Sequence, residues 1–365
     1  MSLTKNYSTV DKLLHYMAFS APVLRNLLSD LENSWYKKEL SATQSENEVF
    51  ITGLPRSGTT LLLELLYQTG EFSTFSYRHM PFILSPLLWK KLSSPFLKTA
   101  ISTERAHGDG MQVNFDSPEA FEEIIWLNYH RTDFTSHDRI TPLTPKNTTR
   151  KFSIDFQRSI NKLLLDASAK QKNTRYISKN NANCSRITLL TKMFPSATLL
   201  IPFREPLSHI GSLMKQHRRF TRMHQQDPFS KRYMRWLGHF DFGENLKPIN
   251  FNDWLDDLNV SPSYEDENFW LQYWIEAYSH ILKTQKRLSQ ASSVFLIDFD
   301  KLIASPRESL DAIATKASLN NYHSLTDMQT AIRATTSTPK GNSSVDQDKL
   351  IIAQELHQQL VSAAL

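Results

Sequence analysis

Short apolar runs alternate with segments of helical periodicity along most of the 365-residue chain. The apolar runs are typical of buried strands and comprise residues 49–52, 175–178, 198–203 and 294–297. Segments with apolar residues at helical spacing lie between them, at residues 59–68, 117–129, 152–168, 182–193 and 207–219. Buried strands that alternate with helices favour a parallel sheet that is covered on both faces. The pattern therefore predicts an α/β fold of three layers, with a central parallel sheet flanked by helices.

Both ends of the chain add helical segments, and two long irregular stretches interrupt the alternation. Residues 10–38 form one helical pattern that places Leu13, Leu14, Met17, Leu24, Leu27, Leu28 and Leu31 on one side. We treat residues 1–45 as an N-terminal helical extension of a single domain that covers residues 1–365. Residues 130–150 and 221–268 are irregular, and the second stretch combines aromatic side chains with prolines. This second stretch is predicted to be either a lid over a ligand or a packed surface excursion.

Composition narrows the class of protein and its compartment. The net charge of +5 suits an anionic ligand but is far from that of a nucleic-acid-binding protein. Cys184 is the only cysteine, which favours a reducing compartment, and the polar N-terminus lacks the apolar core of a signal peptide. No apolar run is long enough to span a bilayer. We therefore expect a cytoplasmic protein. The 12 histidines show no metal-ligand spacing, so no metal is expected.

A glycine-rich loop stands directly between the first apolar run and the next helical segment. It reads Gly53-Leu54-Pro55-Arg56-Ser57-Gly58-Thr59-Thr60. Such a loop turns tightly around a phosphate and directs the free N–H groups of a helix at the anion. Arg56 adds a charged fork, and Thr59 and Thr60 add hydroxyl donors. Thr59 occupies the position of the lysine in the nucleotide-triphosphatase loop, so a P-loop-type fold with a different phosphate chemistry is predicted.

A second candidate phosphate site follows the run 198–203. Arg204 stands at the carboxyl end of this predicted strand, where ligands of α/β sheets bind. Ser212 is two helical turns further on and can face the same way. Both motifs resemble those of sulfotransferases that use 3′-phosphoadenosine 5′-phosphosulfate (PAPS). The arginine form of the loop is similar to the tyrosylprotein and bacterial branches.

The resemblance spans residues 49–319 and implies an in-line transfer of a sulfuryl group from PAPS to a hydroxyl or amine. It implies that residues 56–60 bind the 5′-phosphosulfate, and that Arg204 and Ser212 bind the 3′-phosphate. Residues 176–179, which end in Lys179, resemble the strand and lysine that precede this region in the bacterial branch. Lys340 and the glycine after it are similar to a C-terminal element that touches the 3′-phosphate in cytosolic enzymes.

The general base is predicted less directly, because the glutamate of the tyrosylprotein branch has no equivalent here. His79 follows the first helix after the loop, and the ordinary pKa of histidine suits proton abstraction. His107 and Glu122 are reserve candidates, although Glu122 also fits the capped start of a helix.

The acceptor is predicted to be a small molecule, a lipid or a glycan, bound in part by residues 221–268. Two other classes remain open. A P-loop nucleotide kinase would need a carboxylate such as Asp298 for Mg²⁺, and it would leave Arg204 without a role. An inactive nucleotide-binding module would keep both phosphate sites and lack a base.

Overall fold

The computed structural model describes residues 9–93, 103–104, 112–113, 121–136, 138–168, 174–257, 262–288, 293–332 and 345–365. Its centre is a five-stranded sheet of β1 (Val49–Ile51), β2 (Phe72–Ser73), β5 (Arg175–Lys179), β6 (Thr198–Phe203) and β7 (Ser293–Asp298). The strand order is β2-β5-β1-β6-β7, and every pair is parallel. A separate antiparallel pair joins β3 (Thr103–Glu104) to β4 (Gln112–Val113). The predicted parallel sheet is confirmed.

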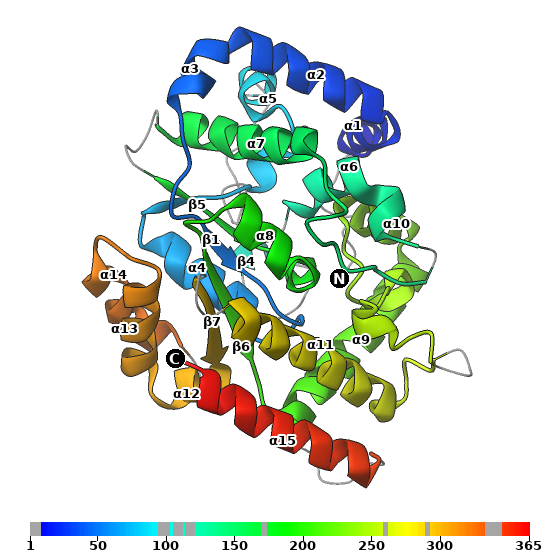
Figure 1. The fold of residues 1–365 in the computed structure, drawn as a ribbon. Helices are drawn as coiled ribbons and strands as arrows, with labels where there is room; N and C mark the ends of the chain where they lie inside the picture. Colours follow the sequence, from blue (N-terminus) through cyan, green and yellow to red (C-terminus); the bar gives the residue numbers. More distant parts are fainter. Residues whose placement is uncertain are drawn as a thin grey trace.

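Helices cover both faces of this sheet (Figure 1). The alternation along β1 shows the two sides, because Phe50 belongs to one apolar cluster while Val49 and Ile51 belong to the other. One face is covered by α4 (Thr59–Gln68), α12 (Phe299–Ala304), α13 (Pro306–Lys316) and α14 (Tyr322–Thr326). The opposite face is covered by α7 (Arg150–Ser168), α8 (Ile187–Met193), α9 (Pro206–Gln226) and α11 (Glu267–Leu288). The three predicted layers are therefore present.

Parallel pairing aligns the carboxyl ends of the strands at one edge of the sheet. In the register, Ile51 of β1 lies opposite Lys179 of β5 and Leu200 of β6. All residues of β1 and β6 are buried, as expected for strands covered on both faces. The segments that follow β5, β1 and β6 consequently emerge next to one another.

The remaining elements surround this core. They are α1 (Thr9–Ser20), α2 (Pro22–Trp35), α3 (Lys37–Ala42), α5 (Pro86–Ser93), α6 (Glu123–Phe134), α10 (Pro228–Leu237) and α15 (Gln347–Ala363). Short 3₁₀ turns are η2 (Tyr77–His79), η4 (Asn181–Ser185), η5 (Gly243–Asn245), η6 (Phe251–Asp253) and η7 (Asp327–Ala331). Among the described residues, no helix has the length and apolarity that crossing a membrane requires.

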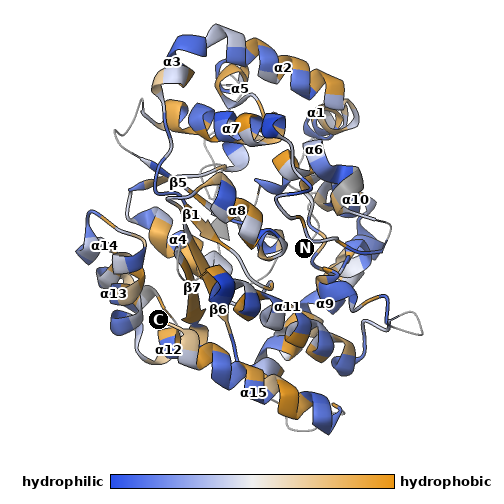
Figure 2. Cartoon of the chain, in the orientation of Figure 1, coloured by the Kyte–Doolittle hydropathy of each residue, from blue (hydrophilic) through white to orange (hydrophobic). Residues whose placement is uncertain are grey.

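The N-terminal segment differs from the single helical run that its periodicity predicts. It forms α1, α2 and α3, because Ala21 leaves the helical conformation and Pro22 begins a new helix, a position where its missing N–H costs nothing. Most of the predicted stripe of leucines faces outward: Leu13, Leu24, Leu27 and Leu31 are exposed, whereas Leu14 and Leu28 are half-buried. Figure 2 shows these helices, with their apolar residues, at the outer edge of the molecule.

Residues 221–268 are more regular than predicted. They continue α9, form α10 and then pass through η5 and η6. Five of their aromatic side chains belong to the larger apolar cluster and are at most 5% exposed: Tyr233, Phe240, Phe242, Phe251 and Trp254. Three others are half-buried against the same cluster: Phe229, Trp236 and Tyr264. These rings are therefore packed inside the described part of the stretch, and its role as a lid over an acceptor stays a prediction.

The C-terminal residues complete the sheet. Helix α15 packs along α11, and Ala364 forms an isolated parallel bridge with Leu296 of β7. The backbone N–H of Leu365 donates to the carbonyl oxygen of Leu296, with an N···O distance of 3.1 Å. The chain end thus covers the outer side of β7.

Candidate active site

The glycine-rich loop leaves β1 and runs into the N-terminus of α4, as the sequence predicts. Gly58 is the N-cap residue of α4, and within the described ranges no side chain caps the first N–H groups of this ten-residue helix. Thr59 and Thr60 lie in its first turn, with Thr59 buried. The loop therefore combines uncapped helix N–H groups with hydroxyls and with the guanidinium of Arg56, which suits an anion.

Two glycines of the loop hold conformations that a larger residue would not. Gly58 has φ +108°, and a Cβ atom there would lie 2.3 Å from the ring of Phe299. Gly53 has φ +141°, and its Cβ atom would lie 3.0 Å from the carbonyl oxygen of Pro202. Because left-handed φ values and close approach both exclude side chains, the packing against β6 and α12 fixes the path of the loop.

The structure joins the two predicted phosphate motifs. Arg204 follows β6, and its Nη1 donates to the carbonyl oxygen of Arg56 at 3.4 Å while its Nη2 donates to Oγ of Ser208 at 3.1 Å. The Nε of Arg56 in turn donates to Oγ of Ser212 at 3.3 Å. Residues separated by about 150 positions, 56 and 204–212, therefore form one cationic cluster.

Burial makes this cluster a demanding environment for positive charge. Arg204 is only 6% exposed, and burial lowers the pKa of its guanidinium, opposed by the nearby charge of Asp300. Among the described residues, no carboxylate forms an ion pair with Arg204. A buried guanidinium gains most from an anionic partner, so this geometry favours binding of a phosphate or sulfate.

A buried histidine, His209 of α9, forms a hydrogen bond with the backbone of the glycine-rich loop. Nε2 of His209 donates to the carbonyl oxygen of Pro55 at 2.9 Å, while Nδ1 accepts from Nε1 of Trp274 at 3.2 Å. The indole can only donate, so the proton of the neutral ring is on Nε2. Burial lowers the pKa of His209 to about 3, which keeps the ring neutral. His209 was not among the predicted site residues, because its position in α9 carries no local motif.

Polar residues from β5, η4 and the segment after α10 meet beside the loop. Oδ1 of Asn181 accepts from Oγ1 of Thr59 at 3.2 Å, and its Nδ2 donates to Oδ2 of Asp241 at 3.0 Å. A small polar cavity adjoins this chain of hydrogen bonds, and its lining includes Lys179, Asn181, His239, Asp241 and Lys247. Lys179 is buried at the carboxyl end of β5. A cation and a carboxylate thus lie next to the loop.

The sequence identified Lys179 only within a motif and did not identify Asn181 or Asp241. The available signal for Asn181 was its place three residues after a predicted strand, at the strand end where ligand-binding residues collect. Asp241 gave no signal, because 60 residues separate it from its partner Asn181.

The carboxylate of Glu122 is buried among hydrogen-bond donors. Its side chain is 1% exposed, with Oε1 accepting from Nε1 of Trp126 and Nδ2 of Asn183, and Oε2 accepting from the hydroxyl of Tyr176. The neighbouring Glu123 forms two charged hydrogen bonds with Arg186, at 2.7 and 2.8 Å. The two glutamates therefore anchor η4, which places Asn181, and a role of Glu122 as the base stays a prediction.

His79 lies in η2, just beyond the carboxyl end of β2 and on the same edge of the sheet as the loop. It is buried, and its Nδ1 accepts the backbone N–H of Ser76 at 3.0 Å. Since Nδ1 is the acceptor, Nε2 carries the proton in the neutral ring. In this tautomer His79 can donate a hydrogen bond, and it would have to release Ser76 before taking up a proton at Nδ1.

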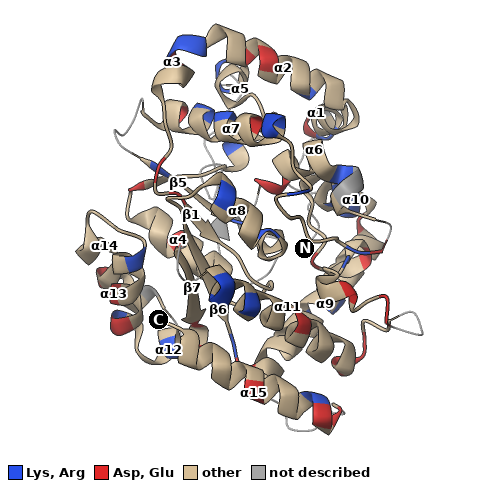
Figure 3. Cartoon of the chain, in the orientation of Figure 1, with Lys and Arg blue, Asp and Glu red and all other residues tan. Residues whose placement is uncertain are grey.

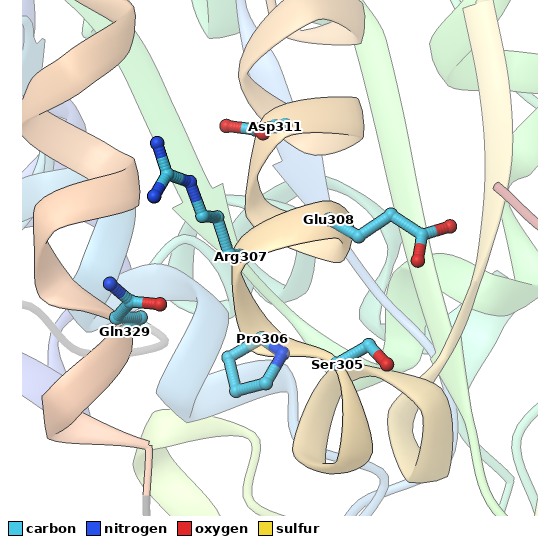
Figure 4. Close-up of a pocket in the computed structure, with 6 residues that line it drawn as sticks. All are labelled: Ser305, Pro306, Arg307, Glu308, Asp311 and Gln329. Carbon is cyan, nitrogen blue, oxygen red and sulfur yellow. The ribbon is translucent and has the colours of Figure 1, made fainter.

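His107 and Lys340 are outside the described residues. Asp298, the carboxylate considered for Mg²⁺, caps α12 by accepting from the backbone N–H groups of Asp300 and Lys301. A surface depression at the start of α13 is lined by Ser305, Pro306, Arg307, Glu308, Asp311 and Gln329 (Figure 4). None of its lining residues belongs to either phosphate motif.

Comparison with known proteins adds independent information. A family model described as "Sulfotransferase family" matches residues 48–251, more than half of the chain. This match includes the glycine-rich loop, η2, η4, Arg204 and Asp241. No curated protein matches the sequence.

Solved structures with a similar fold share little sequence identity with the chain. The sulfotransferase STF1 from Mycobacterium tuberculosis H37Rv is 12% identical, with a TM-score of 0.51 over 93% of this chain and 83% of that one. The sulfotransferase STF9 from Mycobacterium avium is 14% identical, with a TM-score of 0.48 over 91% and 80%. The sulfotransferase domain of the olefin synthase from Synechococcus PCC 7002 is 14% identical, with a TM-score of 0.36 over 86% and 96%.

Proposed function

The chain belongs to the sulfotransferase family, and we propose that it transfers the sulfuryl group of PAPS to a hydroxyl or amine of a small molecule, lipid or glycan. The observation that carries this proposal is the contact between the two phosphate motifs. Arg56 reaches Ser212, and Arg204 reaches the backbone of Arg56. A donor phosphorylated at both its 3′ and 5′ positions supplies an anion for each motif.

In the proposed reaction, the acceptor oxygen or nitrogen forms a bond to sulfur while the bond from sulfur to the 5′-phosphate oxygen breaks. Negative charge collects on the departing phosphate, which faces Arg56 and the N-terminus of α4. Both groups stabilise that charge more as it grows, which is the requirement for catalysis. Lys179, at the neighbouring strand end, is placed to bind the sulfonate oxygens.

The acceptor must lose a proton, and we propose Asp241 as the first candidate base and His79 as the second. Asp241 is half-buried, lines the polar cavity and contacts the loop through Asn181. Its carboxylate has an oxygen beyond the one that accepts from Asn181, whereas His79 offers a protonated Nε2. General base catalysis contributes typically 10²–10⁴-fold.

A kinase is the weaker candidate, because the chain lacks the lysine that a kinase loop needs and uses the possible Mg²⁺ ligand for another purpose. Thr59 replaces the lysine that neutralises the transferred phosphoryl group, and Asp298 is engaged as a helix cap. The kinase reading also leaves Arg204 buried beside the loop without an anion.

Nucleotide-dependent thermal stability tests the proposed donor. Adenosine 3′,5′-bisphosphate at about one hundred times its Kd should stabilise the protein by about 2.7 kcal/mol, a shift of several degrees in Tm. ATP with Mg²⁺ at the same concentration should shift Tm much less, because it leaves the site at Arg204 empty. Arg204→Ala should shrink the difference, and Arg307→Ala, in the depression of Figure 4, should preserve it. A larger shift with ATP would contradict PAPS as the donor and favour phosphoryl transfer from a nucleoside triphosphate.

An assay of sulfated product distinguishes Asp241 from His79 as the base, and an active enzyme from an inactive nucleotide-binding module. Labelled PAPS incubated with a metabolite extract should yield a sulfated product that mass spectrometry identifies. With that acceptor, Asp241→Asn should lower kcat about 10²–10⁴-fold while the bisphosphate still binds. A normal kcat for this variant and a loss in His79→Gln would move the role to His79. Binding of the bisphosphate without any turnover would identify an inactive module.

A further inference from the structure

Helices α1 and α2 present an apolar surface that the described chain does not cover. Eight of their side chains are 40–71% exposed: Leu13, Tyr16, Met17, Val23, Leu24, Leu27, Leu31 and Trp35. At about 100° per residue, the five that belong to α2 fall within an arc of roughly 120°. We call these eight residues the α1–α2 face. Exposed apolar side chains are ordinary when scattered singly, but five along one side of α2, with three more on the neighbouring α1, mark an interaction site.

The opposite side of α2 is polar and buried, so the helix is inverted relative to an ordinary surface helix. Glu32 and Lys162 form an ion pair at 3.4 Å while 0% and 1% exposed. Oε2 of Glu32 also accepts the backbone N–H of Leu88 at 2.6 Å, and Nζ of Lys162 donates to Oγ of Ser29 at 2.9 Å.

This buried network fixes the rotation of α2. Arg25 adds a hydrogen bond from its Nη2 to Oδ1 of Asn128 at 3.2 Å. Turning the leucines inward would carry Glu32 outward and leave the buried Lys162 without its ion-pair partner, which is strongly destabilising. The outward orientation of the α1–α2 face is therefore built into the fold and is not a loose docking of the N-terminal segment.

The size of the face matches a protein interface. Half-exposed side chains of this kind each offer on the order of 100 Å², so eight offer roughly 800 Å², the share that each partner contributes to a standard stable interface. Trp35 and Tyr16 add the aromatic residues that are enriched in interface centres.

The charges around the α1–α2 face favour a protein over a lipid membrane as its binding partner. The exposed or half-exposed charges of α1, α2 and α3 are Asp11, Asp30 and Glu39 against Lys12, Lys37 and Lys38. Figure 3 shows both signs on this edge of the molecule, with blue on α3 and red on α2. Helices that lie on anionic membranes carry an excess of basic residues. A balanced rim instead suits contact with an identical rim, where each sign meets its opposite.

We propose that the α1–α2 face binds the same face of a second copy of this chain, across a two-fold axis. Such an isologous contact pairs α2 with α2 of the partner, and it needs only one self-complementary patch. The pairing is independent of the sulfuryl-transfer chemistry, because none of its residues belongs to the phosphate motifs or to the polar cavity.

Mass measurements on the full chain test the proposal. Light scattering during gel filtration, with sedimentation across the micromolar range, should show a dimer for the wild-type protein. Leu27→Glu places a charge at the centre of the face and should raise the dimer dissociation constant at least about tenfold. Leu31→Lys should do the same with the opposite charge. Ile352→Glu is the matched control on α15, because Ile352 is 51% exposed, and it should stay dimeric.

A separate measurement checks that the variants fold. Leu27→Glu and Leu31→Lys should both keep the increase in Tm that adenosine 3′,5′-bisphosphate produces. A wild-type protein that stays monomeric throughout the micromolar range would overturn the proposal, as would a dimer unaffected by Leu27→Glu and Leu31→Lys together. Incubation with vesicles of phosphatidylcholine and phosphatidylglycerol supplies a further arm. Vesicle binding by a monomeric wild-type protein that Leu27→Glu abolishes would assign the face to lipid.

Discussion

Replacing His209 with glutamine removes a titratable ring from beneath the phosphate loop while keeping a donor and an acceptor. His209 is fully buried and links Pro55 of the loop to Trp274 of α11 through two hydrogen bonds. A glutamine can donate from its amide nitrogen and accept at its amide oxygen. The substitution therefore isolates the effect of protonation from the effect of losing the two contacts.

The expected magnitude follows from the pKa of the buried ring. Burial lowers the pKa of His209 to about 3, whereas an unfolded histidine has a pKa near 6.5. Between these values the unfolded state binds a proton that the native state does not, so stability falls as pH decreases. The loss is about 1.4 kcal/mol per pH unit, or about 2 kcal/mol from pH 6.5 to pH 5, and it is absent above pH 6.5.

Urea unfolding of the wild-type protein and His209→Gln at pH 7.5 and pH 5 measures this effect. The free energy of unfolding should fall by about 2 kcal/mol less in the variant over that interval. His224 and His280, whose pKa values burial lowers to about 4, contribute equally to both proteins and cancel in the difference. Equal acid sensitivity of the two proteins would refute the reasoning.

Ligand binding separates support of the loop from general stability. His209→Leu leaves the carbonyl oxygen of Pro55 and the indole N–H of Trp274 buried without partners, at about 1–3 kcal/mol each. We expect weaker binding of adenosine 3′,5′-bisphosphate in this variant and recovery of most of the affinity in His209→Gln. Normal affinity in a folded His209→Leu protein would show that the loop keeps its position without the ring.

Three further substitutions test the site. Gly58→Ala should lower bisphosphate affinity at least about tenfold by calorimetry, because its Cβ atom would meet the ring of Phe299, while Gly211→Ala, which meets nothing within 4 Å, should bind normally. Glu122→Gln should lower the free energy of unfolding by about 1–3 kcal/mol, because one of its three donors loses its acceptor. A catalytic role for Glu122 would instead appear as a loss of kcat at unchanged stability. Lys179→Ala should lower kcat more than donor affinity in steady-state kinetics, and a pure loss of affinity would contradict its proposed contact with the sulfonate.

The sequence predicted those helices and strands whose local residue pattern matches the position that they take in the folded protein. The bounds of α4 and β6 match the structure, because a buried strand and a helix start both leave composition signals around Gly58 and Arg204. The edge strand β2 was missed, since its two residues are too few to show a period.

Failures occurred where distant parts of the chain decide the outcome. Helical periodicity revealed the leucine stripe of α2 but not its orientation, which the buried pair of Glu32 and Lys162 determines. Likewise, Asp241 lies beside the loop only because α9 and α10 carry the chain back to Asn181. Neither effect has a local signature.

The bridge between Ala364 and Leu296 protects an edge strand of the sheet against aggregation. An outer strand with unpaired N–H and C=O groups is a template on which another chain can add a strand and start an aggregate. Here Ala364 and Leu365, which follow α15, pair with Leu296 in the middle of that row. Shortening the chain by its final residues would open the template with no change at the phosphate loop, so solubility would suffer before catalysis.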